Sequence, residues 1–235
     1  MSGDSVMTST ASFQEAGGGL SPTSPLQSLT VQPLPFSVAK QLLVREHYLH
    51  SYPGAALLNL GIFCGNSLMG VVVLGAGPTN IHRLFRDASR QEVVCLARLW
   101  LDDRLGRNSE SRTLGIILRQ LRKEQTTIKA LVAYSDPMAG HTGVIYKASG
   151  FLYLGKSTVM PLYKLADGSV HHSRSLSHRY GTHSRKYFQL HGVDLELVEQ
   201  EPKYTYVALV EPSWRARLTR TVLPYPLKEQ THGDS

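Results

Sequence analysis

The segment Tyr134-Ser135-Asp136-Pro137-Met138-Ala139-Gly140-His141-Thr142-Gly143-Val144-Ile145-Tyr146 joins a short apolar run to a short helical pattern. The apolar run at 129–135 predicts a strand, and residues 142–149 predict a short helix that Gly150 ends. Such a unit brings polar side chains to the carboxyl end of a strand, where open α/β sheets bind ligands. The segment therefore predicts an α/β fold with a site at this turn.

Several side chains of this segment are candidates for a functional role. Tyr134 and Asp136 stand at the end of the strand, Tyr146 stands on the helix, and two glycines allow close approach of the backbone to a ligand. In the alternative interpretation, Asp136 only starts an Asx turn, His141 caps the helix and Tyr146 packs in the core. Spacing alone leaves both interpretations open.

The chain on either side of this segment predicts further helices and strands. Apolar residues recur at helical spacing in two windows and alternate or cluster as in strands elsewhere. The expected elements are helices at 37–50, capped by Ser37, and 109–124, a hairpin of strands at 57–64 and 68–75, and strands at 92–101, 151–165 and 204–210. Residues 1–34 are rich in Ser, Thr, Gly and Pro and predict a disordered tail. We expect residues 35–165 to form the main domain and 166–235 a basic C-terminal extension that packs on it.

Composition and charge narrow the class of protein. No apolar run reaches the roughly 18 residues of a spanning helix, and the N-terminal residues lack the features of a secretory signal, so we expect a cytoplasmic protein. Cys64 and Cys95 lie in apolar runs and cannot form a disulfide framework or a thiolate zinc cage. The net charge of +7 becomes +9 for residues 37–235, because residues 1–36 carry only Asp4 and Glu15. This surplus favours a polyanionic partner such as nucleic acid.

Arg98 is unusual among its neighbours in the expected strand. Val94, Leu96 and Trp100 share its face at a spacing of two residues, and all three are apolar. A guanidinium in such a position needs a partner, which is either an internal carboxylate or a phosphate of a ligand.

The turn before the helix at 109–124 is a candidate anion site. Residues 108–113 offer free backbone N–H groups, the hydroxyls of Ser109, Ser111 and Thr113, and the charge of Arg112, which suits a pyrophosphate at a helix N-terminus. An ordinary helix capped by Asn108 or Ser109 is the alternative.

Two further groups of polar residues attract attention. His47 lies near the edge of the apolar face of the first helix. To act as a base, proton shuttle or metal ligand it needs a partner, and the neighbouring acid Glu46 points elsewhere.

Residues 171–187 combine basic side chains with interleaved Tyr180 and Tyr187, which is more typical of a phosphate-contacting patch than of a metal site. A solvated basic loop is the alternative. The basic members are His171, His172, Arg174, His178, Arg179, His183, Arg185 and Lys186.

Four motifs in order along the chain resemble those of the Mom family of phage DNA-modification proteins. They are Arg45-Glu46-His47-Tyr48, Leu96-Ala97-Arg98-Leu99, Asn108-Ser109-Glu110-Ser111-Arg112, and Tyr134-Ser135-Asp136-Pro137-x-x-Gly140-His141-x-Gly143-x-x-Tyr146-x-Ala148. The resemblance covers about residues 34–155. It implies a GNAT acyltransferase fold, with a mixed β-sheet splayed open to hold an acyl-CoA and flanked by helices.

The resemblance also implies an activity and a substrate. The expected enzyme is a transferase that converts adenine N6 in double-stranded DNA to an acetamido, or carbamoylmethyl, derivative that blocks restriction enzymes in the infected bacterial host. Acetyl-CoA or a related acyl donor is the expected cofactor, although the glycine-rich pyrophosphate signature of ordinary GNAT enzymes is absent and residues 108–113 stand in its place. Acetyl transfer alone gives N6-acetyladenine, so the acetamido group requires an additional nitrogen donor.

The resemblance assigns roles to individual residues. His47, Tyr48, Asp136 and Tyr146 match positions proposed for catalysis, and His47 and Asp136 match possible ligands of a metal such as iron. Arg98 and Ser111 match positions around the cofactor, and from the turn itself we expect Ser109, Arg112 and Thr113 to bind it as well. Tyr134 and His141 would contact the substrate base, and Arg174, Arg179, Arg185 and Lys186 the DNA backbone. Tyr146 falls where many GNAT enzymes keep a tyrosine that returns a proton to the leaving thiolate.

Two other functions remain open at the level of sequence. An ordinary GNAT enzyme would acetylate a protein or a small-molecule amine without DNA. A non-catalytic protein on the same fold would bind DNA and leave its nucleosides unchanged.

Overall fold

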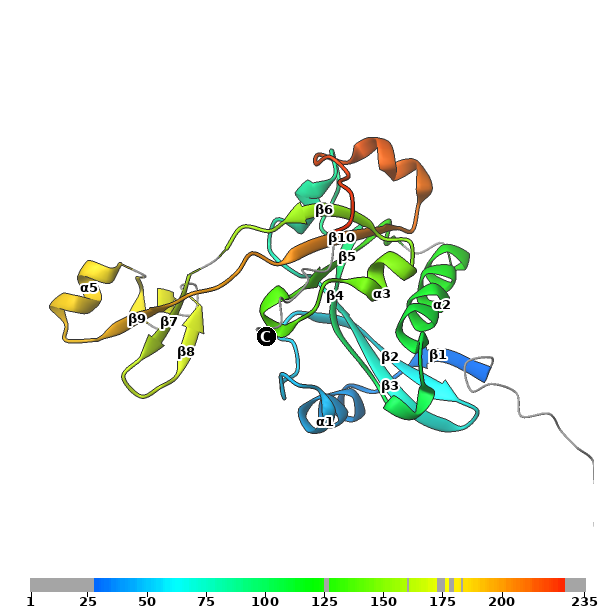
Figure 1. The fold of residues 1–235 in the computed structure, drawn as a ribbon, viewed down its shortest axis with the longest axis horizontal. Helices are drawn as coiled ribbons and strands as arrows, with labels where there is room; N and C mark the ends of the chain where they lie inside the picture. The colour runs from blue at the N-terminus through cyan, green and yellow to red at the C-terminus, as the bar shows by residue number, and fades with distance from the viewer. Residues whose placement is uncertain are drawn as a thin grey trace, which may run out of the picture.

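A seven-stranded sheet forms the body of the protein, and a smaller three-stranded sheet projects from one end (Figure 1). The computed structural model describes residues 28–124, 127–159, 161–172, 176–177, 180–182 and 184–226. The strand order is β1-β2-β3-β4-β5-β10-β6 in the large sheet and β8-β7-β9 in the small one. No helix in these described ranges is long and apolar enough to cross a membrane.

The elements follow the order expected for an α/β protein. The strands of the large sheet are β1 (Leu29–Pro33), β2 (Ala56–Cys64), β3 (Ser67–Gly75), β4 (Val93–Leu101), β5 (Ala130–Ser135), β6 (Leu152–Lys156) and β10 (Tyr204–Leu209). The small sheet holds β7 (Leu162–Leu165), β8 (Val170–His172) and β9 (Leu195–Val198). The α-helices are α1 (Phe36–Glu46), α2 (Ser109–Lys123), α3 (Val144–Ala148) and α5 (Arg185–Leu190), and the 3₁₀ helices are η2 (Ile81–Leu84), η3 (Asp103–Leu105), η4 (Pro137–Ala139) and η5 (Pro212–Arg217).

The large sheet opens between β4 and β5. These two strands run parallel and pair only where Val93 to Cys95 face Ala130 to Val132. Beyond that point β4 continues to Leu101 and β5 to Ser135 without pairing, so the sheet is splayed at the carboxyl ends of both strands. The other neighbouring strands of the sheet are antiparallel. The expected fold class, a mixed and splayed sheet flanked by helices, is confirmed.

The two faces of the sheet carry different elements, because side chains alternate along each strand. Helices α2 and α3 pack on one face, where the apolar stripe of α2 meets Val72, Leu74, Val94, Leu96 and Leu131. Helix α1 packs on the other face against Val71 and Val73. The 3₁₀ segments η2 and η5 cover Val93, Cys95, Val132 and Val207. Since Cys95 lies opposite Gly75 in the register and Gly75 follows Val73 by two residues, α1, η2 and η5 share one face.

The C-terminal residues are part of the main sheet. β10 lies between β5 and β6 and pairs with both, and Tyr206 and Val207 are fully buried there. The strand expected at 151–165 is in fact two strands, β6 in the large sheet and β7 in the small one. A domain boundary at residue 165 therefore does not separate the two sheets. It divides the small sheet after β7, and it assigns β10 of the large sheet to the C-terminal extension.

The small sheet has an apolar core of its own. Tyr163 and Leu165 of β7, Leu176, and Phe188 of α5 are buried together there. Lys186 of α5 is exposed, and Arg185 is the first residue of that helix. Arg174 and Arg179, from the expected DNA-contacting set, lie outside the described residues.

Both boundaries of the first helix and the end of the tail differ from expectation. The expected tail, 1–34, includes β1, which pairs with β2 along its length and buries Leu29 and Val31. Helix α1 starts after Pro35, not after a Ser37 cap, and ends at Glu46, not near His50. It ends early because His47 adopts an extended backbone and its Nδ1 accepts the N–H of Leu49, which turns the chain out of the helix.

Candidate active site

A β-bulge in β4 decides where the Arg98 side chain lies. Arg98 is opposite Val73, but Leu96 is opposite Leu74, so Ala97 is the extra residue. Arg98 therefore shares the α1 face with Val73 and not, as alternation predicts, the face of Leu96. Its guanidinium donates to the carbonyl oxygen of Ala97 at 2.7 Å and contacts the carbonyl and hydroxyl oxygens of Ser51 at 3.4 and 3.3 Å. No carboxylate of the described residues forms an ion pair with Arg98, and partial burial lowers the pKa of this guanidinium.

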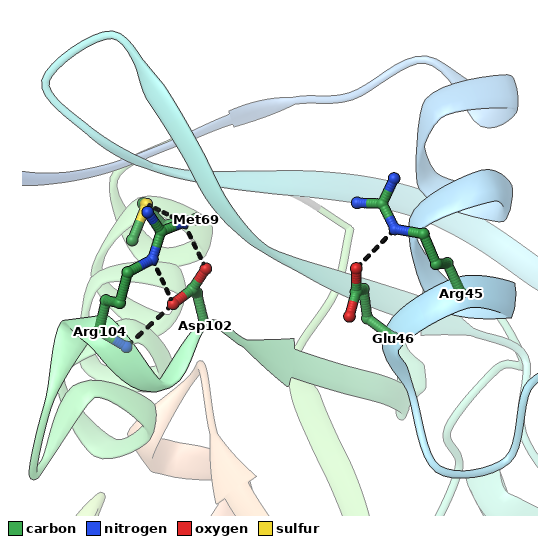
Figure 2. A network of polar contacts seen from close by, with 5 residues as sticks. All are labelled: Arg45, Glu46, Met69, Asp102 and Arg104. Atoms are coloured by element: carbon green, nitrogen blue, oxygen red, sulfur yellow. Dashed lines mark hydrogen bonds and ion pairs between the residues drawn. The ribbon is translucent and has the colours of Figure 1, made fainter.

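His47 at the end of α1 is buried, with 4% of its surface exposed. Its Nδ1 accepts a hydrogen bond from the backbone N–H of Leu49 at 3.1 Å, so the proton of the neutral ring is on Nε2. The neighbouring acid Glu46 points elsewhere, as expected, and forms an ion pair with Arg45 (Figure 2). His47 thus presents an N–H donor and not a free lone pair.

The charge state of His47 follows from its surroundings. Burial, then the positive charge of Arg98, then His50 and His141 lower its pKa from 6.5 to about 4. The Leu49 hydrogen bond acts in the same direction, because a protonated Nδ1 would meet a donor. His47 is therefore neutral at neutral pH.

Tyr48 connects the end of α1 to the segment after β5. Its ring stacks on His47, with centroids 4.5 Å apart, and meets the ring of His141 edge-on at 5.8 Å. Tyr48 keeps 59% of its surface exposed and is thus available to a planar ligand. The contact joins two motifs that lie far apart in the sequence.

Asp136 follows β5 and has two partners. Its Oδ1 accepts the N–H of Met138 at 3.1 Å, in the Asx turn that the sequence offered as the alternative to a functional role. Its Oδ2 lies 3.0 Å from Nζ of Lys203, which precedes β10. The Asp136 side chain is 28% exposed, so solvent and ligands reach it. Lys203 carried no sequence signal as a partner, since it is distant in the chain and stands in no motif.

Tyr146 on α3 lies beneath the end of β5. Its hydroxyl donates a long hydrogen bond of 3.5 Å to the carbonyl oxygen of Tyr134, and its ring packs against Phe151 and Tyr206. Burial raises the pKa of Tyr146, so the hydroxyl keeps its proton at neutral pH. Burial likewise raises the pKa of Tyr134 to about 12.

Gly143 allows α3 to begin close to the sheet. Its φ of +76° is left-handed, and a Cβ at this position would lie 2.4 Å from the ring of Tyr206. The hydroxyl of Tyr206 donates to the carbonyl oxygen of Thr142 at 2.7 Å. A side chain at residue 143 would therefore displace the whole turn that carries His141 and Tyr146.

The start of α2 is the candidate anion site named from the sequence. Asn108 precedes the helix in a left-handed conformation and provides no side-chain cap, while Ser111 donates to the Asn108 carbonyl at 3.1 Å. One turn into the helix, the hydroxyl of Thr113 is fully buried and has no hydrogen-bond partner among the described residues. Ser109 instead donates to Glu110 at 3.2 Å. Asp102 and Arg104, joined by a 2.6 Å ion pair, brace the preceding turn beside Met69 (Figure 2).

The described residues contain no cluster of side chains that could bind a metal ion. No three His, Cys, Asp or Glu side chains there come close enough to hold a metal ion. His47 and Asp136 thus do not form a complete ligand set with their described neighbours.

The structure brings several of the sequence-predicted residues to the region where β4 and β5 separate. His47, Tyr48, Arg98 and His141 lie on or beside the α1 face, and Tyr146 lies on the α2 and α3 face. A family model described as the Mom protein family matches residues 28–227. The chain belongs to the Mom family. One relative is the methylcarbamoylase Mom of Escherichia phage Mu, which is 27% identical over 205 residues, 85% of this chain and 84% of the phage protein.

Solved acetyltransferase structures are also similar to this Mom family chain. An aminoglycoside acetyltransferase, AAC(6')-Ib, in complex with paromomycin and acetyl-CoA matches 83% of this chain and 98% of its own, with 12% identity and a TM-score of 0.48. The ribosomal-protein-S18-alanine N-acetyltransferase from Escherichia coli matches 77% and 94%, with 12% identity and a TM-score of 0.43.

Proposed function

We propose that this chain transfers a carbamoylmethyl (acetamido) group to N6 of adenine in double-stranded DNA and so protects the DNA from restriction. Membership of the Mom family makes the chain a transferase. The name of the phage Mu relative, a methylcarbamoylase, supports this choice of group. The observation that carries the proposal is the contact of His47, Tyr48 and His141 near the point where β4 and β5 separate, with Tyr146 on the opposite face of the sheet beneath the end of β5. The reaction would take place in the cytoplasm of a phage-infected bacterium.

The acceptor requires help from the protein. The N6 lone pair is delocalised into the purine ring, so attack needs a base and a well-placed electrophile. Reaction on a base of a duplex also requires the base to leave the stack, and aromatic side chains commonly hold it. Tyr48 is exposed and contacts both His47 and His141, which suits it to this role, and Tyr134 would be a second contact of the base.

Asp136 is the proposed base. As N6 forms its new bond to carbon it gives up one proton, and an exposed carboxylate held by Lys203 and the Met138 N–H accepts it. His47 is less suited to that task because its Nδ1 is occupied by the Leu49 N–H. We assign it instead to donate a hydrogen bond from Nε2 to an acceptor oxygen or ring nitrogen of the bound reactants. Burial and the charge of Arg98 keep it neutral.

Tyr146 is the proposed proton donor to the leaving group. It retains its proton at neutral pH, and its long hydrogen bond to Tyr134 is easily exchanged for a better acceptor. When bound, the donor would supply the electrophilic methylene carbon of the carbamoylmethyl group and a leaving group on that carbon, which would depart with the proton from Tyr146; a simple acyl-CoA would instead lose its thiolate and give an N6-acyl group. The backbone N–H groups at the start of α2, together with Ser111 and Arg112, would hold the phosphates of a CoA-type donor, whereas Ser109 and Thr113 are buried. Arg98, on the face that carries α1, would contact the acceptor and not these phosphates.

DNA is the proposed partner, and the basic C-terminal residues are part of its contact surface. Arg174, Arg179, Arg185 and Lys186 are the proposed phosphate contacts of this region, and Lys186 is exposed on α5. Substituting Ala for the three arginines should lower the salt dependence of DNA binding by about one log–log unit for each phosphate contact that is removed.

Mass spectrometry of nucleosides tests the function directly. DNA from cells that express the chain should contain a deoxyadenosine derivative heavier by one carbamoylmethyl group, and DNA from cells expressing the Tyr146→Phe variant should contain little. Unmodified nucleosides in the presence of soluble wild-type protein would refute the activity. Acetylation of a small amine or protein without DNA would favour the ordinary acetyltransferase instead.

A further inference from the structure

Two short segments distant in the sequence form a single ridge near the end of the sheet where β4 and β5 begin. The ridge consists of residues 82–90, which include most of η2, and residues 211–220, which include η5. The N–H of Arg86 donates to the carbonyl oxygen of Arg217 at 2.8 Å, and Nε of Arg217 donates to the carbonyl oxygen of Arg86 at 2.8 Å. Thr219 adds two bonds, from its N–H to Leu84 at 2.9 Å and from its hydroxyl to Arg83 at 2.8 Å.

Buried aromatic rings support the ridge from below. Phe85 and Trp214 are nearly inaccessible and their ring centroids lie 5.3 Å apart, over the apolar side chains of β4, β5 and β10. The guanidinium of Arg217 stacks over Trp214 at 4.3 Å. Both hydrogen bonds and packing therefore hold the backbone of the ridge in place. The Cα positions from which its arginine side chains extend are fixed as a result.

The outer surface of the ridge is basic. None of its arginines forms an ion pair within the described part of the chain. Nearby carboxylates have local partners, since Glu92 accepts from the N–H and hydroxyl of Ser89 and Glu211 accepts from Ser213. Asp87 is the remaining acid of the ridge. The arginines are Arg83, Arg86, Arg90, Arg215, Arg217 and Arg220.

The ridge lies on the same face of the sheet as the proposed acceptor side of the site. Tyr134 packs against the apolar cluster beneath η2 and η5, and Cys95, on the same face, connects this cluster to the α1 side. Arg220 donates to the carbonyl oxygen of Lys156 at 2.9 Å, next to the strands that flank Tyr134. Because η5 follows β10 at the end opposite the small sheet, the ridge and the C-terminal basic residues are separate surfaces (Figure 1).

We infer that the ridge formed by residues 82–90 and 211–220 binds the phosphates of the DNA duplex on the face of the sheet that carries the proposed acceptor side of the site. The inference rests on the proposed function and extends it by naming the surface that holds the substrate. Fixed arginines without carboxylate partners suit phosphates, because a guanidinium donates two parallel hydrogen bonds to phosphate oxygens. Such contacts position the duplex without reading its sequence.

Salt-dependent binding of a labelled DNA duplex tests the inference. Arg83, Arg90 and Arg215 are exposed, and their side chains make no hydrogen bond within the described residues, so the variant R83Q/R90Q/R215Q keeps the bonds that hold the ridge together. Each neutralised phosphate contributes about 0.9 to the slope of log affinity against log salt, so removing three arginines should lower the slope by about 3 units. Product yield should fall with it at moderate salt.

A matched control removes the same charge from the opposite face. Arg119 and Lys123 of α2 and Lys147 of α3 are exposed, and the variant R119Q/K123Q/K147Q should keep the wild-type slope. An Arg-to-Lys triple variant of the ridge, which retains the charges, should also keep most of the slope. Thermal unfolding of each variant shows whether it is folded.

The outcomes separate the inference from the function on which it rests. If the wild type modifies DNA but the slope falls equally in the ridge and control variants, or in neither, the ridge is not the binding surface. If wild-type protein neither binds nor modifies DNA, the proposed function itself fails. A selective fall of the slope in the ridge variant supports the inference.

Discussion

Replacing His47 with glutamine should change how the stability of the protein depends on pH. The pKa of His47 falls from 6.5 to about 4 on folding, mainly because the ring is buried and secondarily because Arg98 is positively charged. The folded state therefore disfavours the protonated ring. The stability due to the neutral ring is complete above pH 6.5 and is lost as the pH falls from about 6.5 to about 4.

The expected size follows from the two pKa values. Between about pH 7.5 and about pH 5, the unfolded state takes up nearly one proton at this site and the folded state takes up little, which costs the wild type about 2 kcal/mol. The glutamine of the H47Q variant does not titrate, and its side-chain oxygen can still accept the N–H of Leu49. The variant should therefore lose about 2 kcal/mol less stability than the wild type over this range.

Denaturant unfolding at both pH values measures this difference. Only the difference between the two proteins is informative, because the chain has 10 histidines. Arg98→Gln provides a second test, since removing the positive charge should raise the pKa of His47 and reduce the wild-type loss. Equal pH dependence in the wild type and H47Q would refute the assigned burial and neutrality of His47.

Three further variants test the site and its scaffold. Tyr146→Phe should reduce product yield by about 100-fold or more if the hydroxyl donates the proton. The melting temperature should change little, because the hydrogen bond that the substitution removes is long. An unchanged yield would remove Tyr146 from the mechanism. Asp136→Asn should abolish the product, because the amide cannot accept the proton. The variant should remain folded by circular dichroism, because the amide oxygen can still cap η4. Retained product would mean that another residue is the base. Gly143→Ala should destabilise by about 2–4 kcal/mol in denaturant unfolding, from a left-handed φ and overlap with Tyr206. Gly140→Ala, which has a left-handed φ but open space, should cost only about 1 kcal/mol; equal costs would contradict the packing argument.

Local sequence patterns were sufficient for much of the fold. The apolar stripe of α2, the hairpin of β2 and β3 and the strand–turn–helix unit at residues 130–148 form largely where expected. In each case the signal lies within a few neighbouring residues. The motifs around His47 and Tyr146 likewise indicated the family, and the family model confirms it.

Contacts between distant residues decided the rest. Alternation placed Arg98 beside Leu96, but a bulge set by pairing with β3 turns it to the α1 face. Lys203 reaches Asp136 because β10 inserts between β5 and β6, and the arginine ridge exists because η5 returns to η2. The periodicity of apolar residues in the sequence indicates which side of a single helix or strand is apolar. The strand register, the strand order and the contact partners of a side chain depend instead on which elements pack together. Those choices are made by packing across the whole chain, and they determine on which face of the open sheet each candidate residue lies.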